Sequence, residues 1–196
     1  GLQAAIVKAL DDLDYKKPTP VQAQAIPAFL AGRDLLVSSQ TGSGKTAAFI
    51  LPALQLISQK PLPEPEDNSQ RVKGRRPRPQ PARPHLVVLT PTRELAQQVS
   101  QDAIKLVRHV KGVRISSIMG GMPFGKQIAQ LKGAQVVVAT PGRLLDLVNR
   151  RQLSLDHVQT LILDEADRML DLGFAEDLEA INDLASKREQ TLMFSA

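Results

Sequence analysis

The sequence contains no cysteine, which excludes disulfide bonds and thiolate metal sites. It contains no apolar run close to the roughly 20 residues that a membrane-spanning helix needs. Its first residues lack the charged and then apolar pattern of a secretory leader. The three histidines, His85, His109 and His157, do not have the spacing of a metal site. We therefore expect a cytoplasmic globular protein without a membrane partner.

The chain has 196 residues, which favours one domain with a sizeable core, and its hydrophobic content of 42% is ordinary for such a domain. The formal net charge of +5 favours an anionic partner. However, residues 61–84 hold six Lys or Arg against three acidic residues, so this segment contributes +3 of the +5. The net charge alone is therefore a weak argument for nucleic-acid binding.

Residues 61–84 also hold seven of the fourteen prolines and show no apolar periodicity. This composition is typical of an exposed, largely disordered loop. Such a segment is either a tolerated surface insertion or a basic arm that adds phosphate contacts, and both interpretations stay open.

Outside that segment, apolar runs alternate with helical patterns. Runs such as Val136-Val137-Val138 do not alternate with polar residues, which indicates strands that are buried on both faces. The sequence therefore predicts an α/β domain with a mostly parallel sheet, helices on both faces, and ligands at the carboxyl ends of the strands. The expected strands are 34–38, 85–90, 114–119, 135–140, 159–164 and 190–195. The expected helices are near 2–12, 20–31, 44–58, 92–110, 125–132, 141–150 and 173–185.

A glycine-bearing turn between the first strand and the next helix fits a phosphate-binding loop. Gly42 and Gly44 allow backbone N–H groups to turn around an anion, and the following helix start adds further donors. Lys45 supplies a charge for the β- and γ-phosphates, and Thr46 a hydroxyl for Mg²⁺. A flexible Ser/Gly linker is the alternative. The predicted loop consists of Ser39, Gln40, Thr41, Gly42, Ser43, Gly44, Lys45 and Thr46.

A second constellation ends the strand near residue 164. Asp164 would hold Mg²⁺ directly or through water, and Glu165 could orient or deprotonate the water that attacks the γ-phosphate. An acidic helix start is the alternative for these carboxylates. Joined to a phosphate-binding loop in the same α/β pattern, they indicate a nucleotide-hydrolysing site.

The block Asp164-Glu165-Ala166-Asp167, together with residues 39–46, resembles the DEAD-box RNA helicase family of superfamily 2. Further blocks in the family's order carry the resemblance at 18–22 (Q motif), 91–96 (motif Ia), 120–121 (GG element), 140–143 (motif Ib) and 195–196 (motif III). The resemblance implies that residues 1–196 form one RecA-like P-loop domain with a Q-motif region at about 1–30. Only 61–84 lies outside it. Within the family we expect the bacterial RhlE-like branch.

The resemblance also implies roles for individual residues. Gln22 would bind the N6/N7 edge of adenine and Tyr15 would stack on its ring, which implies ATP as the nucleotide. Asp167, Ser195 and Ala196 would couple the nucleotide site to a second domain. The implied contacts to the RNA backbone are Pro91, Thr92, Arg93, Gly120, Gly121, Thr140, Pro141, Gly142 and Arg143. For Thr92 a helix cap, and for the two glycines a plain turn, are the structural alternatives.

The expected function is that of the ATP-binding half of an RNA helicase, which couples ATP and Mg²⁺ binding and ATP hydrolysis to RNA binding and local duplex unwinding. We expect the second RecA-like domain to lie outside this chain, and the chain alone to be monomeric and nearly inactive. Three alternatives stay open: a DNA translocase, an ATP-gated RNA clamp with little turnover, and a phosphate-loop ATPase unrelated to nucleic acid.

Overall fold

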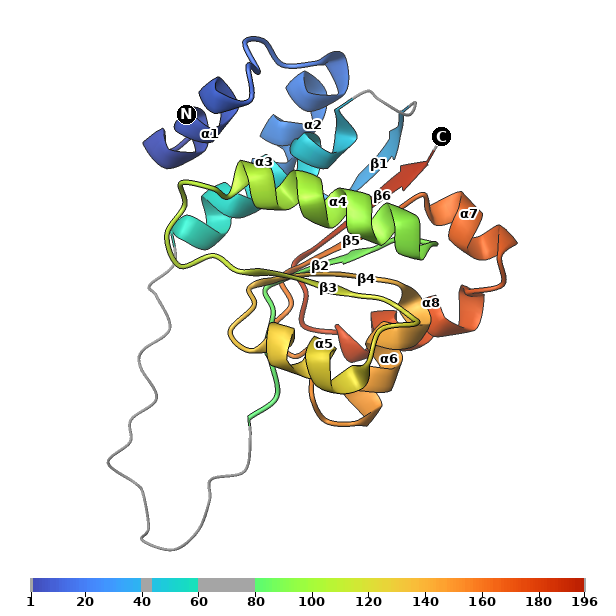
Figure 1. Ribbon diagram of the computed structural model, residues 1–196. Helices are drawn as coiled ribbons and strands as arrows, with labels where there is room; N and C mark the ends of the chain where they lie inside the picture. The colour runs from blue at the N-terminus through green and yellow to red at the C-terminus, as the bar shows by residue number, and fades with distance from the viewer. Residues whose placement is uncertain (1, 40–43, 60–79, 196) are drawn as a thin grey trace, which may run out of the picture.

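The computed structural model describes residues 2–39, 44–59 and 80–195. Its centre is a six-stranded sheet in the order β1-β6-β5-β2-β4-β3, in which all neighbouring strands are parallel (Figure 1). The strands are β1 (Leu35–Ser38), β2 (Leu86–Leu89), β3 (Ile115–Ile118), β4 (Val136–Ala139), β5 (Thr160–Asp164) and β6 (Gln190–Ser195). The expected α/β class and parallel sheet are confirmed.

Helices cover both faces of the sheet. One face is packed by α1 (Ala4–Asp12), α2 (Pro20–Leu30), α3 (Lys45–Ser58) and α4 (Arg93–Leu106). The other face is packed by α5 (Phe124–Leu131), α6 (Pro141–Asn149), α7 (Ala166–Asp171) and α8 (Ala175–Leu184). Within the described ranges, none of these helices combines the length and the apolar character that crossing a membrane requires.

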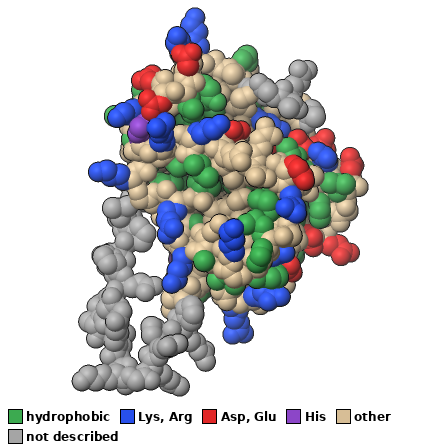
Figure 2. Space-filling model, in the orientation of Figure 1, with side chains coloured by type: hydrophobic (Ala, Val, Ile, Leu, Met, Phe, Trp, Pro, Cys, Tyr) green, Lys and Arg blue, Asp and Glu red, His purple; other side chains and the backbone are tan. Residues whose placement is uncertain are grey.

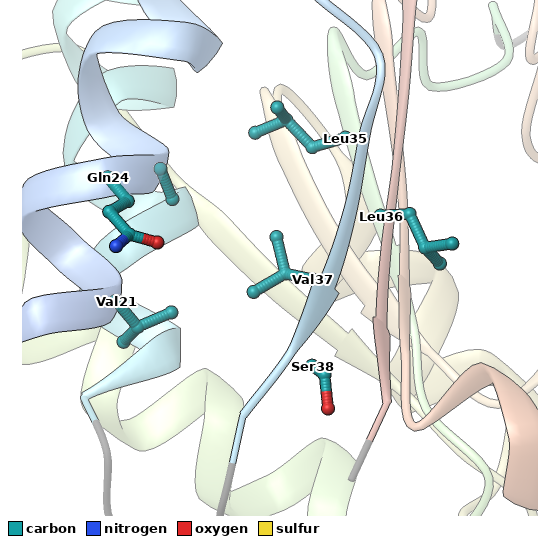
Figure 3. Close-up of a pocket in the computed structure, with 7 residues that line it drawn as sticks. Val21, Gln24, Leu35, Leu36, Val37 and Ser38 are labelled. Atoms are coloured by element: carbon teal, nitrogen blue, oxygen red, sulfur yellow. The ribbon is translucent and has the colours of Figure 1, made fainter.

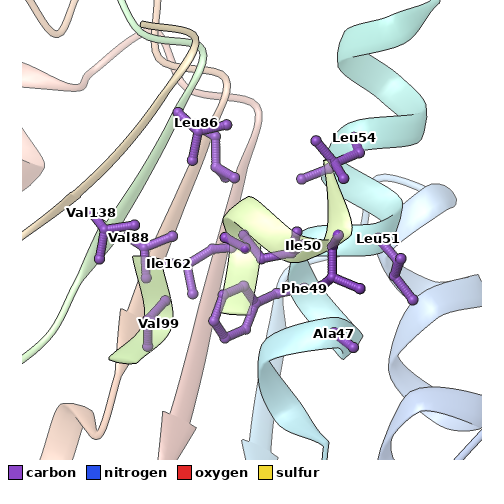
Figure 4. Close-up of a cluster of buried hydrophobic side chains, with 14 of the residues drawn as sticks. Ala47, Phe49, Ile50, Leu51, Leu54, Leu86, Val88, Val99, Val138 and Ile162 are labelled. Atoms are coloured by element: carbon purple, nitrogen blue, oxygen red, sulfur yellow. The ribbon is translucent and has the colours of Figure 1, made fainter. Parts of the chain in front are cut away.

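The apolar runs of the central strands build two cores, because successive side chains point to opposite faces. Val88 and Ile162 face the core beneath α3 and α4, whereas Val87 and Leu89 face the core beneath α5 to α8. Figure 4 shows the first core, where Phe49 of α3 lies among side chains from the sheet and α4. Each fully buried side chain of this size contributes about 1.5–3 kcal/mol. These two cores fix the helices against the sheet.

Because all six strands are parallel, their carboxyl ends meet along one edge of the sheet. The segments after β1 and β5 hold the predicted phosphate-loop and acidic residues, the end of β6 holds Ser195 of the predicted coupling set, and these three strands are neighbours. The loops after β2, β3 and β4 hold the predicted RNA residues, and these strands form the other half of the sheet. The fold therefore places both predicted sites side by side on one edge.

The strands agree with the sequence expectation to within one residue at each end. Two helical expectations need correction. The short helix α7 was not expected, and α4 ends at Leu106 rather than near residue 110. Residues 107–109 form turns, and His109 pairs with Asp12 of α1 at 2.5 Å. The contact between these two side chains holds the end of α4 against the first helix.

Residues 60–79, which make up most of the expected disordered loop, lie outside the described residues. Residues 80–84, which we expected to belong to that loop, are instead tied to the domain. The N–H of Ala82 donates to the carbonyl of Gln152 at 2.9 Å, and the N–H of Ser154 donates to the carbonyl of Ala82 at 2.8 Å. The expectation of a disordered loop over 61–84 is therefore wrong for residues 80–84.

A cavity of about 250 Å³ lies between α2 and β1 (Figure 3). Leu35 and Val37 point from the strand toward Val21 of α2, while Leu36 points to the opposite side and is 81% exposed. The lining of this cavity includes none of the predicted catalytic side chains. The chemistry must therefore be sought at the ends of the strands rather than in this cavity.

Candidate functional site

The start of α3 and the end of β5 bring the two predicted catalytic segments together. Lys45 is the first residue of α3, and its ammonium lies 3.0 Å from Oδ1 of Asp164, the last residue of β5. The same ammonium lies 3.8 Å from Oε1 of Glu165. Thr46 follows in the first turn of α3. The predicted phosphate-binding lysine and two carboxylates therefore share one small region of the sheet edge.

Asp164 is only 1% exposed. Burial raises the pKa of its carboxyl above the ordinary value, and the attraction of Lys45 opposes this rise without cancelling it. Apart from Lys45, Oδ1 has no polar partner in the described part of the chain. A buried carboxylate with one cationic partner fits a site for a divalent cation. No group of three metal-binding side chains occurs among the described residues, so water and phosphate oxygens would have to supply the other ligands of such a cation.

The raised pKa of Asp164 predicts how a neutral replacement behaves. A carboxyl with a raised pKa binds its proton more tightly in the folded state than in the unfolded state. Its contribution to the free energy of unfolding therefore falls as pH rises from below its ordinary pKa to above its raised pKa. Asp164→Asn should therefore raise the melting temperature at pH 7 relative to wild type, with a smaller difference near pH 4. Thermal melts across this range measure it.

The matched control is Asp171→Asn, at an exposed carboxylate of α7. It should leave the pH dependence of the melting temperature unchanged. An Asp164→Asn variant that is less stable than wild type at pH 7 would contradict the prediction. Whatever its own stability, this variant should lose the stabilisation that we expect wild type to gain from ATP and Mg²⁺.

Gly44, the residue of the predicted phosphate loop that directly precedes α3, has a conformation that only glycine adopts easily, with φ of 79°. A Cβ atom here would lie 2.4 Å from Nε2 of Gln22 and 3.1 Å from Oγ1 of Thr19. The amide of Gln22 donates to the carbonyl of Gly44 at 3.1 Å, while its Oε1 accepts from the N–H of Thr19 at 3.0 Å. The Q-motif helix α2 is thereby fastened to the start of α3.

Both polar atoms of Gln22 are engaged within the chain in this structure. The helix-start role is present as a full capping box between Thr19 and Gln22. An amide oxygen can accept a second hydrogen bond and an amide nitrogen can donate a second one, so adenine binding by Gln22 stays a prediction. Tyr15 lies in the connection between α1 and α2 and is 52% exposed. Its ring is accessible for the predicted stacking.

Glu165 directly precedes α7, as its N-cap residue, in a left-handed conformation with φ of 54°. Its carboxylate is 3.4 Å from the guanidinium of Arg168, one turn further along the helix. Asp167 is exposed, and no hydrogen bond or ion pair joins it to Ser195 in the described structure. The carbonyl of Ser195 instead accepts from the N–H of Ser39 at 2.9 Å. The predicted coupling role of Asp167 and Ser195 remains a prediction.

Five of the predicted site residues lie outside the described residues, and their roles stay predictions: Gln40, Thr41, Gly42, Ser43 and Ala196. Ser39, which occupies the first position of the loop, is described. Its hydroxyl is buried and has no hydrogen-bond partner in the described part of the chain.

The loop after β2 combines a helix cap with an exposed cation. The hydroxyl of Thr92 accepts from the N–H of Leu95 at 3.2 Å and so caps α4, as the structural alternative predicted. Arg93 is exposed, and its Nη1 would lie 2.5 Å from a Cβ atom at Gly121. Any side chain at Gly121 would therefore displace this guanidinium. Pro91 is buried, so its side chain offers no surface to RNA.

The loop after β4 leads into α6. Pro141 occupies the first turn of α6 and is buried, and Thr140 precedes it without a side-chain cap bond. Nη1 of Arg143 donates to the carbonyl of Met122 at 3.2 Å. The structure thus joins the GG loop, which follows β3, to the first turn of α6. Gly120 and Gly142 complete the predicted set, and open space surrounds Gly120.

Sequence reasoning missed four residues that hold the site in shape: Thr19, Met122, Phe124 and Arg168. A capping-box pattern at Thr19 and Gln22 could have indicated the first. The spacing of three between Glu165 and Arg168 could have indicated the last. The contacts of Met122 and Phe124 with Arg143 depend on how different helices and loops pack together, and no local sequence pattern indicates them.

Comparisons with known proteins agree with this arrangement. The sequence profile described as "DEAD/DEAH box helicase" matches residues 19–196. The chain is 44% identical to the ATP-dependent RNA helicase DeaD of Escherichia coli K12 over 197 positions, which cover 100% of this chain and 28% of that protein. It is also 44% identical to the ATP-dependent RNA helicase CshA of Listeria monocytogenes, again over 100% of this chain and 34% of that protein.

Among solved structures, a hypothetical ATP-dependent RNA helicase from Sulfolobus tokodaii superposes with a TM-score of 0.84 at 34% identity. This match covers 100% of the chain and 51% of that structure. The expected RecA-like helicase fold is thereby confirmed, whereas the RhlE-like branch stays untested. The chain spans about a third or less of the curated relatives reported above. From the profile match and these identities, the chain belongs to the DEAD/DEAH box helicase family.

Proposed function

We propose that this chain is the ATP-binding half of an ATP-dependent RNA helicase. The observation that carries the proposal is the 3.0 Å contact between Lys45 and Asp164, which joins the phosphate loop to the acidic strand end. The names of the relatives, ATP-dependent RNA helicases, support ATP and RNA as the two ligands. Beside this contact, the same edge of the sheet holds a second set of loops that are suited to a polyanion.

In the nucleotide half, Lys45 would contact the β- and γ-phosphates, and the start of α3 would supply backbone N–H donors. Asp164 and Thr46 would hold Mg²⁺, which when bound neutralises charge on the phosphates. Glu165 lies next to Asp164 and would position the attacking water and accept its proton. The Lys45 ammonium that now pairs with both carboxylates would turn to phosphate oxygens when nucleotide binds.

In the RNA half, the donors are hydroxyl groups, guanidinium groups and helix starts. Thr92, Arg93, Thr140 and Arg143 would contact phosphates, and Gly121 lets the chain approach closely. None of these groups is arranged to read base edges, so we expect little sequence preference. Discrimination between RNA and DNA would come from 2′-hydroxyl contacts.

We further infer that efficient hydrolysis needs a second RecA-like domain. In related phosphate chemistry an arginine supplied from another domain or protein accelerates the reaction by about 10³ to 10⁵. The chain alone should therefore bind ATP with Mg²⁺ weakly, hydrolyse it very slowly and unwind no duplex. Asp167, Ser195 and Ala196 would couple the nucleotide site to that second domain.

A binding and turnover assay on this chain tests the proposal. Fluorescent ATP should bind only with Mg²⁺, and labelled single-stranded RNA should bind better than DNA of the same length in competition. Rapid RNA-stimulated turnover by this chain alone would contradict the need for a second domain. Equal competition by DNA would favour the DNA translocase instead.

A further inference from the structure

Two arginine side chains contact the aromatic ring of Phe124. The guanidinium carbon of Arg143 lies 4.1 Å from the centre of the Phe124 ring, and that of Arg150 lies 4.0 Å from the same centre. Phe124 begins α5, whereas the two arginines stand at the two ends of α6, seven residues apart and on one side of the helix. Contacts of this kind are attractive and hold both guanidinium groups against the ring.

This arrangement holds two like charges close together. Each charge lies about 4 Å from one point, so the two are no further apart than roughly one Debye length at physiological salt, about 8 Å. Asp146 lies one turn before Arg150 on α6, yet no ion pair within 4.0 Å joins either arginine to an acid in the described structure. An anion from outside the chain would relieve this repulsion.

Arg150 has free donors for such an anion. Nη1 of Arg143 is already used by the carbonyl of Met122. Arg150 is exposed, and its guanidinium donates no hydrogen bond within the described part of the chain. A guanidinium that stacks on a ring keeps its N–H groups directed outward in the plane, where they can meet a phosphate. The ring thus orients the side chain and leaves its donors available.

The surroundings are basic. Residues 122–151 hold five Lys or Arg side chains and one acid, so their net charge is +4. Figure 2 shows Lys and Arg side chains between hydrophobic ones on the part of the surface formed by α5 and α6. A carboxylate of α8, that of Asp177, lies 3.8 Å from where a Cβ atom of Gly142 would be, at the start of α6. Arg150 stands at the opposite end of this helix.

We propose that Arg150, oriented by Phe124, forms a further phosphate-binding position for the backbone of single-stranded RNA. It extends the RNA surface from the first turn of α6 to the end of that helix. Phe124 is a positioning residue in this arrangement, because it touches the two arginines and not the RNA. The inference rests on the proposed RNA-binding function.

Arg150→Gln tests the inference, with Arg151→Gln as the matched control. Arg151 is the next residue, is exposed and makes no ring contact in the described structure. Binding of a labelled oligouridine is measured by fluorescence anisotropy over a salt series, with Mg²⁺ and a non-hydrolysable ATP analogue. Arg150→Gln should weaken binding about 3- to 10-fold at low salt and reduce the salt slope by about 0.7. Arg151→Gln should change the affinity by less than about twofold.

Phe124→Leu keeps an apolar side chain and removes the aromatic face. If the ring positions Arg150, adding Phe124→Leu to Arg150→Gln should weaken binding less than the two single effects combined. Thermal melts of each variant confirm that the domain is folded.

The outcomes separate the inference from the proposed function on which it rests. Equal effects of Arg150→Gln and Arg151→Gln, with wild-type binding intact, would overturn the inference alone. Independent effects of Phe124→Leu and Arg150→Gln would overturn the positioning role of the ring. Absence of oligouridine binding by wild type would overturn both the inference and the proposed function.

Discussion

Replacing Glu165 by Gln should abolish ATP turnover while ATP binding persists. The change removes the carboxylate that would accept a proton from the attacking water, and a positioned base typically contributes about 10²- to 10⁴-fold in rate. Gln keeps the size of the side chain next to Asp164, so the contact between Lys45 and Asp164 should survive. Phosphate release in a protein that joins this domain to its second domain measures turnover. Fluorescent ATP measures binding.

Glu179→Gln is the matched control for this substitution, since Glu179 is exposed on α8. It removes the same charge from a position remote from Lys45, and it should leave turnover unchanged. Undiminished hydrolysis by Glu165→Gln would remove Glu165 from its proposed role. Loss of ATP binding by the same variant would show that the carboxylate is needed for the shape of the site instead.

Replacing Lys45 by Ala should remove most of the ATP affinity. The substitution deletes the charge that would contact the phosphates, and losing one charge-assisted contact of this kind typically costs about 1.5–3 kcal/mol, or roughly 10- to 150-fold in affinity. Titration of fluorescent ATP in the presence of Mg²⁺ measures the loss. Lys105→Ala, at an exposed lysine of α4, should leave the affinity unchanged.

The same variant has a second, independent effect. Burial raises the pKa of Asp164, and the ammonium of Lys45 is the group that opposes this rise most strongly. Without that ammonium, the pKa of Asp164 should rise further. Stability at pH 7 should then fall relative to wild type and recover as pH is lowered, because the protonated carboxyl is tolerated. A Lys45→Ala variant that binds ATP normally would contradict the assignment of the phosphate loop.

The fold was largely predictable because its strands have a local sequence pattern that identifies them. Unbroken apolar runs such as 136–138 indicate burial on both faces, and the structure places alternate residues of these strands in two cores. The short helix α7 was not predictable in this way. It directly follows Glu165, whose φ is 54°, and that conformation is set by the surrounding structure rather than by a local pattern.

The candidate site was predictable where a motif supplies its own geometry. Lys45 and Asp164 lie far apart in sequence, yet both follow strands of one parallel sheet, so the edge rule brings them together. The contact of Gln22 with Gly44, across 22 residues, depends on how α2 packs against α3. The stacking of Arg143 on Phe124 depends in the same way on how α5 meets α6. Such contacts between helices cannot be predicted from the local patterns of a single sequence.

The division of the sheet into two halves has a consequence for regulation. The halves meet at β5 and β2, whose paired residues Leu163 and Leu89 lie directly before Asp164 and Thr90. At the proposed sites, a bound triphosphate and a bound ribonucleotide chain would therefore be neighbours on one sheet. Thermodynamic linkage makes any effect of one ligand on the affinity of the other reciprocal. Such coupling would not have to be transmitted over a long distance, because the two ligands would bind at the ends of adjacent strands.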